Sequence, residues 1–286
     1  MYKQATLDLI NSVEFLPISK KILEDTMSII DNHSLTPEQL AEIISKDQAA
    51  VAKILALANS PVYGLSKKVS TIEMALVLLG IENIKEHLIS IAILANKKEE
   101  SNPYFLWDEF NKHCYLTAHL SQIIAGDFNY RITKEAFVAG LLQDIGIPII
   151  HQYLSDEFRL ISELKFYRKF SQTSAEKLVL GKTHEDIGAL LLEKWNYPEN
   201  LIDSIKYHHK PSEAKVNPKL AAIVHLANHI ISKNLPSYML NDENEELDPS
   251  IIKILNIPDE TYLHDIINNL SSLVHKIENS SNIEGN

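Results

Sequence analysis

The middle of the chain contains the stretch on which the interpretation of the fold depends, Phe137-Val138-Ala139-Gly140-Leu141-Leu142-Gln143-Asp144-Ile145-Gly146. Its first six residues are apolar or small, which predicts a buried helical turn. Asp144 comes directly after this turn, with Gly146 close behind it. Because an unpaired carboxylate is costly to bury, Asp144 must be paired, bound to a ligand or hydrogen-bonded. The stretch therefore predicts an acidic group held inside a helical core.

Helical patterning continues on both sides of this stretch. Apolar residues recur at the spacing of a helix face almost everywhere, and only 8 of the 286 residues are glycine. No convincing run alternates β-branched and polar residues, as a half-buried strand would. The sequence therefore predicts an all-α fold.

Several helix starts are marked by a Ser or Thr that is followed three residues later by Glu or Gln. In this capping box, side chains satisfy the first backbone N–H groups of the helix. Three segments fit it: Thr36-Pro37-Glu38-Gln39, Ser70-Thr71-Ile72-Glu73 and Thr173-Ser174-Ala175-Glu176. Another helix is expected to end near Asn59-Ser60-Pro61, where Asn and Ser can cap it and Pro cannot continue it. We interpret this turn as structural rather than functional.

Composition and charge exclude several classes of protein. The single cysteine, Cys114, cannot form an internal disulfide, and the first ten residues lack the pattern of a signal peptide, so we expect a cytoplasmic setting. No apolar stretch reaches the roughly 18–20 residues that a membrane span needs. Acidic residues number 38 against 27 Lys and Arg, with no basic stripe. Neither membrane insertion nor nucleic-acid binding is therefore expected.

A change in composition predicts a domain boundary in the first half of the chain. The segment 97–103 is charged, then polar, and ends in proline. We place the boundary there, between an N-terminal helical bundle (residues 1–100) and a second helical unit (residues 101–275). The last residues, 276–286, are polar and are expected to form a flexible tail.

The stretch around Asp144 resembles the Gly-Leu-Leu-His-Asp-Ile-Gly signature of the HD-superfamily metal phosphohydrolases, with Gln143 in place of the signature histidine. Further matches follow the order of that superfamily, and they are His113, the run Thr183 to Leu191, Trp195-Asn196-Tyr197-Pro198, the run Ile205 to His209, and Ile223 to Asn228. Asn228 stands where the superfamily has its last metal-binding aspartate. The resemblance therefore departs from the enzyme pattern at two positions.

The N-terminal half narrows this resemblance. Its segments look like the pattern of the HD-related output domain family, and they are Leu16-Pro17, Leu40 to Asp47, Ala58 to Gly64, Ser70-Thr71-Ile72, and Ala75 to Gly80. The resemblance runs from about residue 12 to about residue 232. It implies an N-terminal helical bundle packed on a modified HD-like helical bundle.

In two-metal HD enzymes, the first ion is held by residues that correspond here to His113, Gln143, Asp144 and Asn228. Two of these four are neutral amides, which are poor ligands for a transition ion and lower the negative charge of the site. The resemblance therefore implies that the first ion is lost and that His113, Gln143 and Asn228 are vestigial.

The second ion of those enzymes corresponds to a set that is complete in this sequence: Asp144, His184, His208 and His209. Imidazole and carboxylate groups suit Fe, Mn, Ni or Zn, so a single divalent transition metal is one interpretation. The other is a polar core without a metal, in which the histidines hydrogen-bond to one another, to Asp144 and to water. We prefer the polar core, and hence no cofactor.

The resemblance implies a non-catalytic regulatory module that acts through protein–protein contacts. The family is associated with bacterial signal transduction and, in some members, with motility control. No appended domain is recognisable, so partners are expected to be other signalling proteins that bind in trans; the oligomeric state is not predicted. The alternatives are a phosphohydrolase with a reduced single-metal site and a nucleotide-sensing domain without hydrolysis. Ile147 occupies the place of a phosphate-binding lysine, which disfavours a cyclic-dinucleotide phosphodiesterase.

Overall fold

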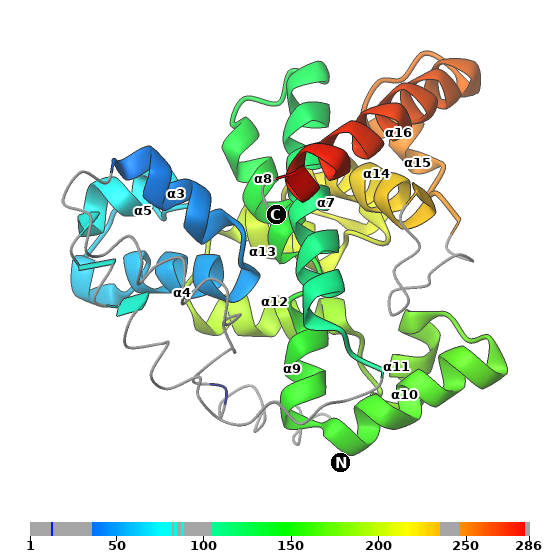
Figure 1. The fold of residues 1–286 in the computed structure, drawn as a ribbon, viewed down its shortest axis with the longest axis horizontal. Coiled ribbons are helices and arrows are strands. Elements are labelled where there is room, and N and C mark those ends of the chain that lie inside the picture. Colours follow the sequence, from blue (N-terminus) through cyan, green and yellow to red (C-terminus); the bar gives the residue numbers. More distant parts are fainter. Residues whose placement is uncertain are drawn as a thin grey trace.

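The computed structural model describes residue 13 and residues 36–81, 83–84, 87–88, 104–234 and 246–283. Across this part of the chain the secondary structure consists of α-helices and two short 3-10 helices, with no strand. The predicted all-α fold is confirmed. Figure 1 shows the N-terminal helices gathered on one side of the molecule, beside a larger bundle formed by the rest of the chain.

The N-terminal unit consists of α3 (Pro37–Ser45), α4 (Gln48–Ala58), η1 (Pro61–Tyr63) and α5 (Ile72–Leu79). The capping box predicted at Thr36 is confirmed: its hydroxyl accepts from the backbone of Gln39, and the Gln39 side chain accepts from the backbone of Thr36. Most of α4 is buried, because it packs against α3 and α5 and also against the larger bundle. This helix therefore joins the two halves of the fold.

The larger bundle is centred on three helices that pack against one another, α7 (Trp107–Asp127), α8 (Thr133–Leu142) and α14 (Pro218–Asn234). Around them lie α9 (Gly146–Tyr153), α12 (His184–Lys194), α13 (Glu199–Lys206) and η2 (Pro211–Glu213). The side chains that α7, α8 and α14 bury between them are overwhelmingly apolar. Among the polar exceptions are His113 in α7 and Asn228 in α14, two residues that the sequence analysis singled out.

Two further pairs of helices complete the bundle. A hairpin of α10 (Ser155–Arg168) and α11 (Gln172–Leu180) lies at one edge of the molecule (Figure 1). At the C-terminal end, α15 (Ser250–Ile254) is followed by α16 (Glu260–Ile283), which packs on α14 and α7. Residues 276–283, expected in a flexible tail, are the last turns of α16.

The other two predicted capping boxes are wrong. The cap of α5 is Thr71, whose hydroxyl accepts from the backbone of Met74, one residue later than predicted. The cap of α11 is Ser171, which accepts from Ser174, two residues earlier than predicted. Each segment holds more than one Ser or Thr within four residues, so spacing alone does not select the one that caps. The correction at α11 frees Glu176 for a different role.

The turn Asn59-Ser60-Pro61 ends α4 as predicted. The buried Asn59 amide donates to the carbonyl oxygens of Leu55 and Val69, at 3.0 and 2.8 Å, and accepts from the backbone N–H of Val69 at 2.7 Å. It therefore caps the helix and also fixes the loop that leads to α5. Ser60 accepts from the backbone of Val62 at 3.5 Å, and Pro61 opens η1.

Hydrogen bonds link the N-terminal unit to the larger bundle. The hydroxyl of Tyr197, which is fully buried, donates to the carbonyl oxygen of Ala52 in α4 at 2.7 Å. From α4, the Gln48 amide donates to the carbonyl oxygen of Leu141 at the end of α8 at 2.6 Å. Lys53 lies over the ring of Trp195, 4.8 Å from its centroid. The segment predicted as a boundary, 97–103, lies outside the described residues.

Among the described helices, none combines the length and the apolar character that a bilayer crossing requires.

Candidate metal centre

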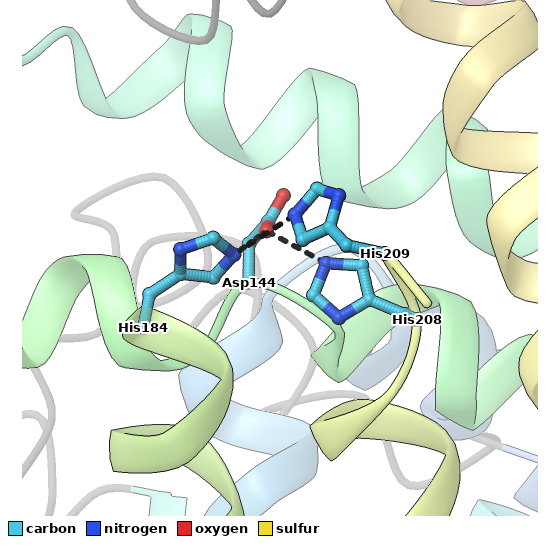
Figure 2. A group of neighbouring side chains, drawn as sticks. All are labelled: Asp144, His184, His208 and His209. Atoms are coloured by element: carbon cyan, nitrogen blue, oxygen red, sulfur yellow. Dashed lines mark hydrogen bonds and ion pairs between the residues drawn. The ribbon is translucent and has the colours of Figure 1, made fainter. Parts of the chain in front are cut away.

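Four side chains from three segments of the chain meet in the core of the larger bundle, namely Asp144, His184, His208 and His209. One potential ligand atom of each lies within 4.8 Å of those of the others. His184 and His208 point their Nε2 atoms at Asp144 Oδ1, at 3.3 and 3.6 Å, and Figure 2 shows the three rings converging on the carboxylate. The structure thus brings together all four candidate ligands of the second ion.

Gly146 allows Asp144 and His184 to approach each other. Asp144 lies in the turn between α8 and α9, and His184 is the first residue of α12. A Cβ atom on Gly146 would lie 2.0 Å from the carbonyl oxygen of His184. One turn later in α12, a Cβ atom on Gly188 would meet the Ile145 side chain at 3.0 Å. Glycine is therefore required where the start of α12 crosses the Asp144 turn.

The paired histidines follow the C-terminal end of α13. His208 is fully buried, and its Nδ1 atom donates to the carbonyl oxygen of Ile205 at 2.7 Å. The Nε2 atom of His209 lies 3.2 Å from that of His184. The carbonyl oxygen of His208 accepts from His225 Nδ1 at 2.8 Å, so His225 supports this segment and is not part of the ligand set.

The arrangement of donor atoms fits a divalent transition ion. His208 Nε2 is buried without a hydrogen-bond partner, and its 3.6 Å separation from Asp144 Oδ1 exceeds an ordinary hydrogen bond. The Nδ1 atoms of His184 and His208 are both hydrogen-bonded on the side away from Asp144. In metal centres, this second bond typically orients a histidine ligand and fixes its tautomer. Nitrogen and carboxylate donors together suit Fe, Mn, Ni or Zn.

Charge inside the cluster is balanced by close contacts. Burial alone would raise the pKa of Asp144, but the imidazoles of His184 and His208, which face its carboxylate, hold that pKa well below its ordinary value. Burial would lower the pKa of His184, yet the charge of Glu176 and the bond to Asp144 raise it well above the ordinary value. Asp144 is therefore an anion at the centre of the cluster.

Hydrogen bonds connect the three side chains that the sequence predicts to be vestigial, namely His113, Gln143 and Asn228. Asn228 Oδ1 lies 2.8 Å from His113 Nε2 and accepts from Gln143 Nε2 at 3.0 Å. The same Gln143 amide donates to Asp144 Oδ2 at 3.3 Å. All four side chains are buried, with Gln143 fully so. The amide of Gln143 thus lies between the side chains of Asp144 and Asn228 and bonds to both.

Glu176 contacts this cluster directly, and the sequence analysis does not single it out. It is fully buried in α11, and its Oε2 atom accepts from both the backbone N–H and the Nδ1 atom of His184, each at 2.8 Å. Its position eight residues before a candidate ligand carries no recognised spacing, since the contact depends on how α11 folds back on α12. The only sequence signal was an apparent helix cap, which the structure contradicts.

The larger bundle is all-helical, its Leu-Leu-Gln-Asp-Ile-Gly turn supplies an aspartate, and three histidines from later segments meet that aspartate. This combination defines an HD-like domain, which is joined here to an additional N-terminal helical unit. A family model of the HDOD domain matches residues 16–211, more than half of the chain. The chain therefore belongs to the HDOD family.

Similarity to a curated protein and to solved structures extends over most of the chain. An uncharacterized protein of Treponema pallidum (strain Nichols) is 24% identical over an alignment of 272 residues. The alignment covers 93% of this chain and 50% of that protein, so the chain spans about half of its length. The response regulator MmoQ from Methylococcus capsulatus str. Bath has a TM-score of 0.69 at 21% identity and covers 85% of this chain and 93% of its own. A virulence factor from Campylobacter jejuni subsp. jejuni has a TM-score of 0.66 at 25% identity. The match covers 91% of this chain and 100% of the virulence factor.

Proposed function

We propose that the chain is a signalling module that acts through contacts with other proteins and does not hydrolyse phosphate esters. The observation that carries this proposal is the hydrogen-bonded amide of Gln143. It donates to both Asp144 and Asn228, so the place of the first ion of an HD enzyme is filled by a neutral group of the protein itself. A two-metal centre needs negative or imidazole ligands at this place.

The surroundings of Asp144, His184, His208 and His209, the candidate ligands of the second ion, also favour a non-catalytic role. Asp144, His184 and His208 are at most 4% exposed, which leaves little room for a phosphate ester beside them. Ile147, where many HD enzymes have a substrate-binding lysine, is 2% exposed and apolar. A phosphate group at this position would lose its water without gaining a cation, which is unfavourable.

An apolar surface on the N-terminal unit supports a role in protein contacts. Val62 in η1 and Val77 in α5 are each 89% exposed. Further large apolar side chains with at least 36% exposure lie in the same elements and the loop between them, namely Tyr63, Leu65, Met74 and Leu78. Large apolar side chains that stay exposed in one unit of a fold are candidates for contacts with other proteins. Signalling proteins that bind in trans are the proposed partners, and the name of the MmoQ response regulator agrees with such a role.

Because four donor atoms converge and His208 Nε2 has no hydrogen-bond partner, we further propose that the core retains one structural divalent ion, in place of the metal-free polar core preferred from the sequence. Asp144, His184, His208 and His209 would hold it, and the ion would cross-link α12 and the end of α13 to the turn after α8. The same four residues favour a second candidate function, a phosphohydrolase with one metal ion. An ion of this kind supplies a Lewis acid and activates water when the site is open.

The decisive experiment measures metal content and turnover on the same preparations. Protein purified without chelator or histidine tag is compared with a His208→Ala/His209→Ala variant by elemental analysis and in phosphatase assays with mono- and diester substrates. We expect about one transition-metal ion per wild-type chain, loss of that ion in the variant, and no turnover above background in either. Metal-dependent turnover that the variant lacks would establish the second candidate. Wild-type protein without metal would refute the retained ion.

A further inference from the structure

We propose that Glu176 is a positioning residue of this metal centre, which sets the orientation and the affinity of His184 without touching the ion. The inference rests on the proposed retention of one ion and extends it to a residue of the α10–α11 hairpin. Glu176 is fully buried, and a buried carboxylate is costly unless its oxygens are hydrogen-bonded. Its bonds therefore identify its role.

The bonds of Glu176 converge on one ligand. Oε2 accepts from the backbone N–H and from Nδ1 of His184, both at 2.8 Å, while Oε1 accepts from the Gln172 amide at 2.5 Å. An ionised carboxylate can only accept hydrogen bonds, so Nδ1 of His184 must carry a proton. In a neutral imidazole the lone pair then lies on Nε2, the atom that faces Asp144 Oδ1 at 3.3 Å.

A comparison with His208 shows what the carboxylate adds. His208 is oriented in the same way, but its Nδ1 atom donates to a neutral carbonyl oxygen, that of Ile205. A carboxylate partner makes an imidazole a stronger electron donor than a carbonyl partner does. The Glu176 carboxylate also adds a second negative charge to that of Asp144. Only the imidazole ring of His184 would separate this charge from a bound divalent ion. Glu176 should therefore strengthen metal binding as well as direct the ring.

The same bonds connect the centre to the hairpin. Lys165 in α10 donates to Gln172, and Gln172 donates to Glu176, so a continuous chain of contacts runs from α10 through α11 to His184. Lys165, Gln172 and Glu176 all lie in α10 or α11, outside the stretches that form the HD-like ligand motif. The hairpin therefore has a specific structural task, which is to hold His184 in place.

The test compares three proteins: wild type, Glu176→Gln and Glu176→Ala. Zn²⁺ affinity is measured by competition with a chromophoric chelator, and the visible spectrum of the Co²⁺ form reports the coordination geometry. A glutamine oxygen can still accept from Nδ1, so Glu176→Gln removes the charge and keeps the orientation, whereas Glu176→Ala removes both. We expect Zn²⁺ affinity to fall by roughly 10- to 100-fold in Glu176→Gln, and further in Glu176→Ala.

Glu135→Gln is the matched control, because Glu135 is also buried and accepts a hydrogen bond, from Tyr130 at 2.7 Å, away from the centre. Its Zn²⁺ affinity should equal that of the wild type. Melting temperatures in EDTA separate affinity from stability: an affinity loss in Glu176→Gln at an unchanged metal-free melting temperature supports positioning. Wild-type affinity in both Glu176 variants, with metal bound, overturns this inference alone. A wild-type protein that binds neither Zn²⁺ nor Co²⁺ overturns the retained ion and this inference together.

Discussion

Gly146 determines whether the start of α12 can reach Asp144. A Cβ atom there would lie 2.0 Å from the carbonyl oxygen of His184, and the obstacle is backbone, which cannot rotate away. We expect Gly146→Ala to reduce the free energy of unfolding by about 3 kcal/mol or more, at or above the upper end for overpacked cores. Denaturant unfolding followed by circular dichroism measures it.

Gly126→Ala is a control that should change the free energy of unfolding in the opposite direction. Gly126 lies in α7 with nothing within 4 Å of an added Cβ atom, so alanine there should stabilise the helix by about 0.5–1 kcal/mol. Equal effects of the two substitutions would contradict the argument from close approach.

His151 should make stability depend on pH. Its ring stacks on Phe105, with centroids 4.4 Å apart, and contacts Trp107 and Phe158 edge to face. Burial in this aromatic cluster lowers the pKa of His151 to about 4. The unfolded chain binds the proton more readily, so this contribution is complete above about pH 6.5 and is lost as the pH falls towards 4. Because the ring is partly exposed, we expect a loss of only about 1–2 kcal/mol.

The measurement is the free energy of unfolding at pH 7 and pH 4.5 for wild type and His151→Phe. The variant should lose less stability between the two pH values than the wild type. His264→Gln serves as the control, since His264 is exposed and should leave the difference unchanged. A wild-type pH dependence retained in His151→Phe would assign it to other groups.

At the scale of elements, Asp203 holds the connection between α13 and α14. Its carboxylate accepts from the backbone N–H groups of Lys215, Val216 and Asn217, at 2.9–3.2 Å, immediately before α14 begins. The His208-His209 pair lies within the loop that this contact closes. Three backbone donors therefore depend on one side chain.

We expect Asp203→Ala to destabilise the protein by about 2–4 kcal/mol, because the donors lose a charged acceptor. Asp203→Asn keeps one acceptor oxygen, so it should reduce the free energy of unfolding by less than Asp203→Ala does. The control is Asp259→Ala: Asp259 is exposed and accepts from Tyr262 at the start of α16, so about 1 kcal/mol is expected. Urea unfolding ranks the three variants, and a loss at Asp203 no larger than at Asp259 would contradict the proposed closure of the loop.

Helices were predictable from the sequence, but not all their ends and supports. The capping box predicted at Thr36 is confirmed, because the Pro and Gln that follow it leave one arrangement of the first turn. At α5 and α11 more than one nearby Ser or Thr could cap the helix, so the sequence does not decide which residue does. Asp203 and Glu176 each act on a backbone segment 8 to 14 residues away. Such contacts depend on how two helices pack, and no local pattern records them.

At the scale of the whole molecule, Tyr197 joins the N-terminal unit to the HD-like bundle. Its buried hydroxyl donates to α4, and the Lys68 amine donates to its carbonyl oxygen at 3.0 Å. We expect the chain to unfold in one cooperative transition, with fluorescence and circular dichroism coinciding. Tyr197→Phe should cost about 1–2 kcal/mol and preserve that single transition. Tyr262→Phe, at a side chain that is 50% exposed, should have almost no effect. Two separate transitions in the wild type would show that the junction is weak.

The proximity of Asp144, His184, His208 and His209 could be predicted because these residues follow a family order along the chain. The order of residues along the chain does not predict the contacts that join the N-terminal unit to the HD-like bundle. The bond from Asn196 to the carbonyl oxygen of Asn59 joins positions 137 residues apart, and both side chains read locally as turn formers. Their pairing exists only once the two units are packed.

The contact of Lys53 with Trp195 has a consequence for spectroscopy. The chain has two tryptophans: Trp195 lies under a cation at the junction, and Trp107 lies 5.9 Å from His151 in the aromatic cluster. The two indoles thus emit from different surroundings, one beside a permanent charge and one beside a ring that becomes charged only in acid. Trp107→Phe would leave an emitter that reports on the junction, and Trp195→Phe would leave one that a protonated His151 quenches. The protein therefore carries two natural optical probes, one for each region, without any added label.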